Sequence, residues 1–173
     1  KNGALGDNGY LSSAARLTLG LAEALTFGVN ATLKDYDVQT QLHRVDYAKA
    51  WGLDIQHGTW RDGLLIQAAY MRGQNWRLAT RVRNTVPWFD AKQIQASWYL
   101  SHNSDRIVGV EPMVRVSIAD PNKRSSNEGG MLFTPGFAAY FQGRSRVSAN
   151  LDMYRSSHDG TFWALRVGTL LYF

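Results

Sequence analysis

The sequence contains no cysteine among its 173 residues, which excludes disulfide bonds, thiol catalysis and cysteine-ligated zinc sites. It also lacks any uninterrupted apolar run near the roughly 18 residues that a membrane-spanning helix needs, and its mean hydropathy is −0.30. Charged residues are scarce at 19%, and proline occurs only four times. These features exclude a helical membrane protein and any enzyme that depends on a cysteine.

Glycine and aromatic residues are abundant, with 16 Gly, six Trp, eight Tyr and seven Phe. Both are typical of β-barrels, in which aromatic rings form girdles at the membrane interfaces. A barrel strand shows only every second residue to lipid, so a membrane barrel can have the mean hydropathy of a soluble protein. The composition therefore favours an all-β protein and is compatible with a membrane barrel.

The net charge is +5, from 19 Lys and Arg against 14 Asp and Glu. The basic residues are spread from Lys1 to Arg166 and form neither a block nor a recognised nucleic-acid motif, so we expect no nucleic-acid partner.

The sequence does not open with a charged and then apolar leader, and we expect any export signal to have been removed or to lie outside it.

The clearest local pattern is a period of two near the end of the chain, from Phe162 to Phe173. One face of this segment is compatible with lipid, and its side chains are Trp163, Leu165, Val167, Thr169, Leu171 and Phe173. The other face is small and mixed, and it includes the charge of Arg166. Alternation over about eleven residues with aromatic residues at both ends predicts a membrane-spanning strand.

The same template recurs upstream and predicts nine strands. They are Ser12 to Ala22, Thr26 to Lys34, Val45 to Gln56, Leu64 to Gly73, Phe89 to Leu100, Arg106 to Ala119, Met131 to Phe141, Arg146 to Arg155 and Phe162 to Phe173. The four upstream strands match less well, because a residue such as Lys49 falls in an apolar set. We expect one domain over residues 1–173, an antiparallel up-and-down transmembrane β-barrel, in which residues 1–11 form an external loop or an irregular segment.

Apart from the last loop, Ser156 to Gly160, every second connection between the predicted strands is longer, as in outer-membrane barrels with tight periplasmic turns and longer external loops. Bacterial single-chain barrels have even strand numbers, so nine strands suggest the C-terminal part of a larger barrel. The alternative is a complete eight-stranded barrel, which requires Ser12 to Ala22 not to be a strand, or an error elsewhere in the strand count.

Several motifs occur in order along the second half of the chain. They are Val110-Glu111-Pro112, an acidic loop at Asp120, Thr134-Pro135-Gly136, the turn Gln142-Gly143-Arg144 and a final strand that ends at Phe173. From Phe89 to Phe173 the chain resembles the C-terminal region of the phosphate-selective porin family. The resemblance implies a sixteen-stranded porin of a Gram-negative outer membrane, usually a homotrimer, which conducts small anions such as phosphate. It also implies that Phe173 belongs to the signal read by the barrel-assembly machinery.

Selectivity in a porin comes from charges that face the water-filled lumen. The alternation places candidate selectivity residues on this face, namely Arg115, Arg146, Arg166, Glu111 and Asp152. The alternative is that these charges pair with one another across neighbouring strands and only stabilise the wall.

A second candidate site is a basic cluster in the long connection from Gly73 to Trp88, formed by Arg77, Arg81 and Arg83. It has three possible roles, which are a constriction inside the pore, a binding site for lipopolysaccharide phosphates, and a solvated surface loop. The aromatic residues expected at the membrane interfaces include Trp98, Trp163, Tyr172 and Phe173.

The four histidines lie in separate turns or loops, without a metal-ligand spacing. Ser156, Ser157, His158 and Asp159 are merely adjacent in sequence, which is not how a catalytic triad converges. We therefore expect no metal, no cofactor and no enzymatic activity, and the expected partners are outer-membrane lipid, lipopolysaccharide and small anions.

Two other functions remain open at this point. One is a small barrel plugged by its own side chains, which acts in recognition, adhesion or envelope anchoring and does not conduct. The other is a soluble ligand-binding barrel of the lipocalin type, with apolar residues inside and charges outside. A requirement for detergent would separate this soluble barrel from the two membrane proteins.

Overall fold

The computed structural model describes residues 12–36, 46–75, 86–102, 104, 106–125, 128–142, 145–157 and 160–171. Nine β-strands account for most of these residues. They are β1 (Ser13–Ala22), β2 (Leu25–Tyr36), β3 (Asp46–Thr59), β4 (Asp62–Gln74), β5 (Trp88–Ser101), β6 (Ile107–Asp120), β7 (Gly130–Phe141), β8 (Arg146–Ser156) and β9 (Gly160–Leu170). Within these ranges, no helix has the length and apolar composition needed to cross a membrane.

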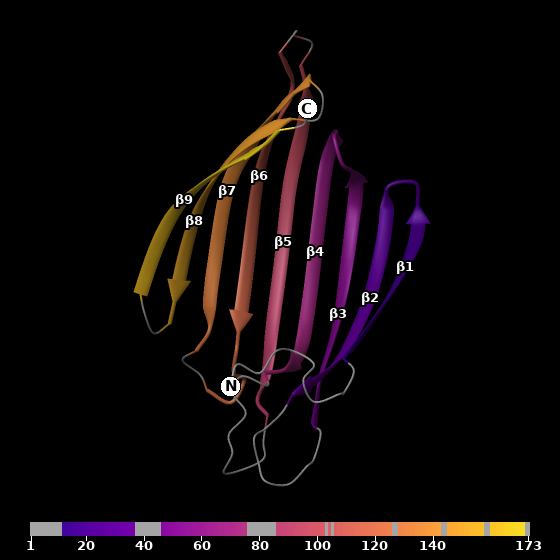
Figure 1. The fold of residues 1–173 in the computed structure, drawn as a ribbon, viewed down its shortest axis with the longest axis vertical. Coiled ribbons are helices and arrows are strands. Elements are labelled where there is room, and N and C mark those ends of the chain that lie inside the picture. The colour runs from indigo at the N-terminus through magenta and orange to yellow at the C-terminus, as the bar shows by residue number, and fades with distance from the viewer. Residues whose placement is uncertain are drawn as a thin grey trace.

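The strands form a single sheet in which each strand is antiparallel to the next, in the order of the sequence from β1 to β9. Figure 1 shows them side by side in one curved sheet with an up-and-down path. In the described part of the chain, β1 pairs only with β2 and β9 only with β8, so the sheet is open. The predicted all-β, antiparallel, up-and-down arrangement of nine strands is confirmed.

The strand boundaries agree closely with the predicted ones at β6, β7 and β8. The segment from Ser12 to Ala22, on which the eight-stranded alternative depended, contains β1 and pairs with β2 over nearly its whole length. β3 runs further than predicted, to Thr59, because a bulge lets the strand continue past His57 before the turn at Trp60. Residues 1–11, which were expected to be loop or irregular, lie outside the described residues.

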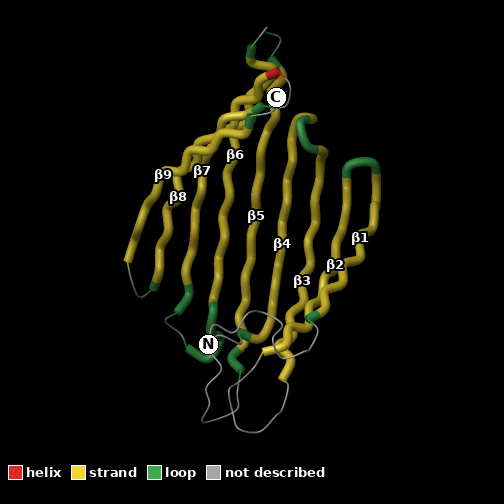
Figure 2. Tube along the Cα trace, viewed as in Figure 1, coloured by secondary structure: helices red, strands yellow, loops and turns green. Residues whose placement is uncertain are grey.

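Apart from residues 157–159, the connections divide by length between the two ends of the sheet (Figure 2). At one end, which we call the short-turn end, they are residues 23–24, 60–61, 102–106 and 142–145. At the other end, which we call the long-loop end, they are residues 37–45, 75–87, 121–129 and 157–159. The three longest connections all lie at the long-loop end, so the predicted alternation of connection lengths is also confirmed.

Side-chain alternation combined with the register gives the sheet two different faces. The buried side chains of the strands share one face, and they are Ala48, Leu65, Ser97, Glu111, Thr134, Ala138 and Tyr140. Side chains converge on the concave side of a curved sheet and diverge on its convex side, so we call this side the inner face. The opposite side, the outer face, carries most of the exposed large apolar side chains.

Glycines make room for large side chains on the inner face. A Cβ atom added to Gly109 would lie 2.3 Å from the Tyr99 hydroxyl oxygen, and one added to Gly130 would lie 2.5 Å from that of Tyr154. In both places an aromatic side chain from the neighbouring strand covers the glycine, an arrangement that also fixes the register of designed β-sheets. The high glycine content of the sequence therefore serves the packing of the inner face.

Gly58 provides a sharper test of this local structure, because its φ of 92° is favourable only for glycine. A Cβ atom there would lie 2.1 Å from the carbonyl oxygen of Leu64, which belongs to the backbone of β4. We predict that Gly58→Ala lowers the free energy of unfolding by about 1–3 kcal/mol from backbone strain alone. The measurement is the urea concentration at the midpoint of unfolding, with tryptophan fluorescence as the probe.

The control for this variant is Gly20→Ala. Gly20 has open space around its Cβ position and no positive φ, so alanine there should leave stability unchanged or raise it by up to about 1 kcal/mol. Equal urea midpoints for the two variants would show that the bulge at Gly58 is not formed as described.

Candidate functional site

The charges of the inner face form the candidate site. Among the described side chains this face carries three carboxylates, Asp54, Glu111 and Asp152, together with Arg16, Lys34, Arg61, Arg115, Arg146 and Arg166. All five candidate selectivity residues predicted from the sequence therefore lie on one face. Among these described side chains, six cations against three carboxylates give a net charge of +3.

Asp152 on β8 is the centre of the first cluster on the inner face. Its carboxylate is 2.5 Å from Nε of Arg166 on β9 and also accepts a hydrogen bond of 2.9 Å from Nη2 of that residue. On the other side, the buried hydroxyl of Thr134 donates to it at 2.7 Å, and Nη2 of Arg115 lies 3.9 Å away. Arg115 and Arg166 thus have the cross-strand pairing that the sequence left as the alternative to a selective role.

Glu111 on β6 is the centre of the second cluster. It is only 8% exposed, and its carboxylate accepts a 2.6 Å hydrogen bond from the Ser97 hydroxyl and another from the Tyr140 hydroxyl. Burying a carboxylate is costly unless donors replace the lost water, and these two neighbours supply them. Glu111 is therefore a buried junction between β5, β6 and β7 and is not a free charge.

Arg61 is the functional candidate that the sequence analysis did not single out. It lies in the turn between β3 and β4 with a φ of 63°, and its guanidinium carbon is 4.7 Å from the Trp60 ring centroid and 4.2 Å from that of Tyr140. The turn therefore folds over the inner face and reaches β7. The Nε and Nη2 atoms of Arg61 are buried and have no hydrogen-bond partner among the described residues, which is unusual for a guanidinium group.

Arg61 and Arg146 share one property that separates them from the other arginines of the inner face. Neither forms an ion pair with a carboxylate among the described residues, whereas Arg16, Arg115 and Arg166 each lie within 4 Å of one. Arg146 follows the turn after β7 and faces Tyr140 in the register. Both unpaired arginines are thus near Tyr140, at the short-turn end of the inner face.

The outer face is apolar along most of each strand. In β6 the outward residues from Val108 to Ile118 are all apolar, including Pro112. This segment is about 33 Å long at roughly 3.3 Å per residue. Trp98 and Trp163 lie on this face, 57% and 75% exposed, near the short-turn end and the long-loop end respectively. The membrane-interface role expected for these two residues stays a prediction.

A polar rim borders this band at the long-loop end. Asp90 and Asp120 face each other in the register of β5 and β6, and the ammonium group of Lys123 lies 3.4 Å from both carboxylates. Hydrogen bonding to Asp90 and then to Asp120 raises the pKa of Lys123 above its usual value. Arg72 adds a further contact, 3.7 Å from Asp90, and its guanidinium carbon is 5.5 Å from the Trp88 ring centroid.

Several predicted site residues lie outside the described residues. They are the loop arginines Arg77, Arg81 and Arg83 and the terminal aromatic residues Tyr172 and Phe173. No protein-family model, curated protein or solved structure matches the chain. The resemblance to phosphate-selective porins therefore stays a prediction, and the geometry of the two faces is what supports a function.

The Glu111 junction leads to a prediction for Tyr140→Phe. This variant removes one of the two hydroxyl donors to a buried carboxylate and should lower the free energy of unfolding by about 1.5–3 kcal/mol, as for hydrogen bonds to charged groups. The matched control is Tyr154→Phe, because the Tyr154 side chain is 39% exposed. It should change stability by less than about 0.5 kcal/mol. Equal losses in urea unfolding would show that the Glu111 junction does not stabilise the sheet.

Proposed function

We propose that the chain forms part of the wall of a β-barrel in a Gram-negative outer membrane and mediates passive diffusion of small solutes, with a preference for anions. The observation that carries this proposal is the contrast between the two faces. Every described strand except β8 has exposed large apolar side chains on the outer face, whereas soluble monomers rarely expose large contiguous apolar patches. Away from the polar rim at the long-loop end, the charges lie on the inner face, opposite to the arrangement of a soluble lipocalin-type barrel.

The two edges of the sheet support a barrel. An unpaired strand edge leaves backbone N–H and C=O groups without partners, which is not tolerated in lipid. In a membrane, β1 and β9 must therefore pair with each other or with further strands. The sixteen-stranded porin predicted from the resemblance is the second of these arrangements, and the nine described strands would be a little more than half of its wall.

The electrostatics of the inner face support a preference for anions. Its three described carboxylates are each held by an arginine or by hydroxyl donors, as at Asp54, where Nη2 of Arg16 is 2.6 Å away. Arg61 and Arg146 have no carboxylate partner within the part of the chain that the structure describes. A lumen lined by this face would attract anions, because charged walls of low dielectric focus their field into the channel.

A second candidate is a barrel plugged by its own side chains that acts in recognition or envelope anchoring. The observation in its favour is the crowding at the short-turn end. There the ring centroid of Tyr140 is 6.3 Å from that of Trp60 and 5.6 Å from that of Tyr99, and Arg61 covers the ring. If the sheet closed tightly on itself, these side chains would fill the lumen, and the barrel would not conduct.

The test of transport is the conductance of the purified protein in a planar bilayer under a salt gradient. We predict discrete conductance steps, a reversal potential of anion sign, and block by added phosphate. Arg146→Glu should shift the reversal potential towards the value of a cation-selective pore, because it changes the net charge of the described inner face from +3 to +1.

The control for this variant is Arg155→Glu, which makes the same charge change on the outer face, next to Met131. It should leave the reversal potential where it is. A folded, membrane-inserted barrel that gives no conductance would rule out the porin and favour the plugged barrel.

Membrane placement has its own test in β6. Val114 faces outward near the middle of the apolar segment, and Met113 beside it faces inward. We predict that Val114→Arg lowers the free energy of unfolding in lipid vesicles by about 2–4 kcal/mol, the cost of arginine facing lipid at the bilayer midplane. Met113→Arg places the same group at the same depth on the inner face and should cost far less. Equal losses would mean that the outer face does not contact lipid.

A further inference from the structure

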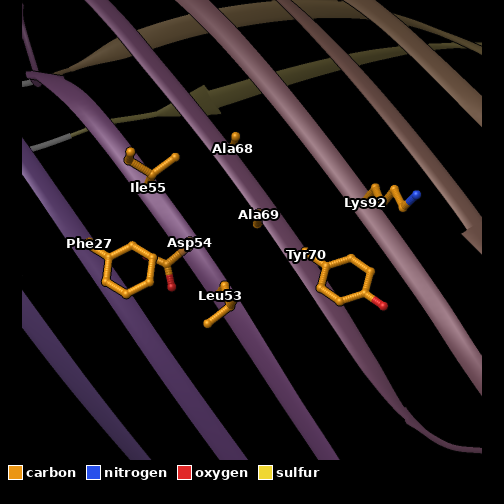
Figure 3. Close-up of a pocket in the computed structure, with 8 residues that line it drawn as sticks. All are labelled: Phe27, Leu53, Asp54, Ile55, Ala68, Ala69, Tyr70 and Lys92. Carbon is orange, nitrogen blue, oxygen red and sulfur yellow. The ribbon is translucent and has the colours of Figure 1, made fainter.

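The outer face is not uniformly convex, because a shallow apolar depression lies over β2, β3, β4 and β5 (Figure 3). The side chains around it belong to Phe27, Leu53, Ile55, Ala68, Tyr70 and Lys92. Asp54 and Ala69 also border the depression, but they occupy the alternate strand positions whose side chains belong to the inner face. The Asp54 carboxylate pairs there with Arg16. The depression exists because Ala68 is small while its neighbours Ile55 and Tyr70 are large.

The register orders this region into three rows that run across the strands. The first row, Phe27, Ile55 and Ala68, is entirely apolar. The second row, one step nearer the long-loop end, contains Tyr70 beside Lys92. The third row contains Trp51 beside Arg72. Polarity therefore rises steadily from the depression towards the rim, which is the order of an acyl chain followed by a phosphate headgroup.

The charges of the rim single out Lys92. Arg72 lies near Asp90, and Lys123 lies between Asp90 and Asp120. Lys92 is exposed on the same face and makes no ion pair with a carboxylate among the described residues. Together these three cations and two carboxylates have an excess charge of +1, carried by the lysine at the edge of the depression.

We propose that this depression is a binding site for a phosphate-bearing anionic lipid. An acyl chain lies along Phe27, Ile55 and Ala68, and the lipid phosphate meets the ammonium group of Lys92. The site rests on the proposed membrane placement, since only there is the outer face in contact with lipid. Trp51, whose ring centroid is 5.3 Å from that of Tyr70, lies next to the headgroup position and can report occupancy.

The experiment uses the protein reconstituted in phosphatidylcholine vesicles that contain an equal fraction of either brominated phosphatidylglycerol or brominated phosphatidylcholine. Bromine quenches nearby tryptophan fluorescence, so the two probes compare an anionic with a zwitterionic headgroup. We predict stronger quenching by the anionic lipid, with an enrichment of about fivefold at the site, the factor expected from one basic residue near an anionic surface. Trp51→Phe should remove most of this difference.

Two variants test the two halves of the site. Lys92→Gln should abolish the preference for the anionic lipid, and Ala68→Phe should abolish it by filling the depression while Lys92 is retained. The matched control is Lys49→Gln, an exposed lysine of the outer face in β3 that does not line the depression. Its variant should keep the preference.

The outcomes separate this proposal from the function on which it rests. Quenching by neither lipid would overturn the membrane placement and the site together. Equal quenching by both headgroups, or a preference that survives Lys92→Gln, would overturn the site and leave the membrane barrel intact. In a further outcome, the other tryptophans are quenched normally and Trp51 is protected. This would mean that another protein molecule, for example a second copy of this chain, covers the depression, and it would also overturn the lipid site.

Discussion

Strict alternation of side chains along paired strands is the constraint on which the rest of this structure depends. A slip of one residue in the pairing of any two strands would turn all later side chains to the opposite face. The register is interrupted by bulges at a few places, near Gly20, Gly58 and Val108, and all of these are close to the short-turn end. In the middle of the sheet the alternation is unbroken, so the apolar and charged residues separate cleanly onto two faces.

The inner face satisfies two opposed requirements. It is concave and therefore crowded, which favours small residues, but it also carries nine described charges that need partners or water. Glycine resolves part of this conflict, since the ion pair between Arg16 and Asp54 crosses β2 directly above Gly28, where a Cβ atom would lie 2.6 Å from the carboxylate. Hydroxyl groups resolve another part, because Thr134 and Ser97 fit between strands and donate to the carboxylates of Asp152 and Glu111.

The sequence was sufficient to predict the strands, because a period of two is a local signal and the tight connections carry glycine and polar residues. It was also sufficient to place Arg115, Arg146, Arg166, Glu111 and Asp152 on one face. It could not show which of them pair, since Arg115 reaches Asp152 only through the register of β6 with β7 and of β7 with β8. The sequence also could not predict that Arg61 folds inward, because a positive φ at a turn arginine leaves no sequence signal.

The structure divides the arginines of the inner face between two roles, and this division bears on transport. Arg115 and Arg166 are fixed by Asp152 and are partly neutralised, so they mainly hold β6, β8 and β9 together. Arg61 and Arg146 lie at the short-turn end near Tyr140, where no described carboxylate neutralises them. If the inner face lines a lumen, the two arginines that no described carboxylate fixes in place therefore lie at one mouth, close to the buried Glu111. An anion at this mouth would then meet two guanidinium groups that are not held by a described carboxylate, whereas the arginines in the middle of the wall are held by Asp54 and Asp152.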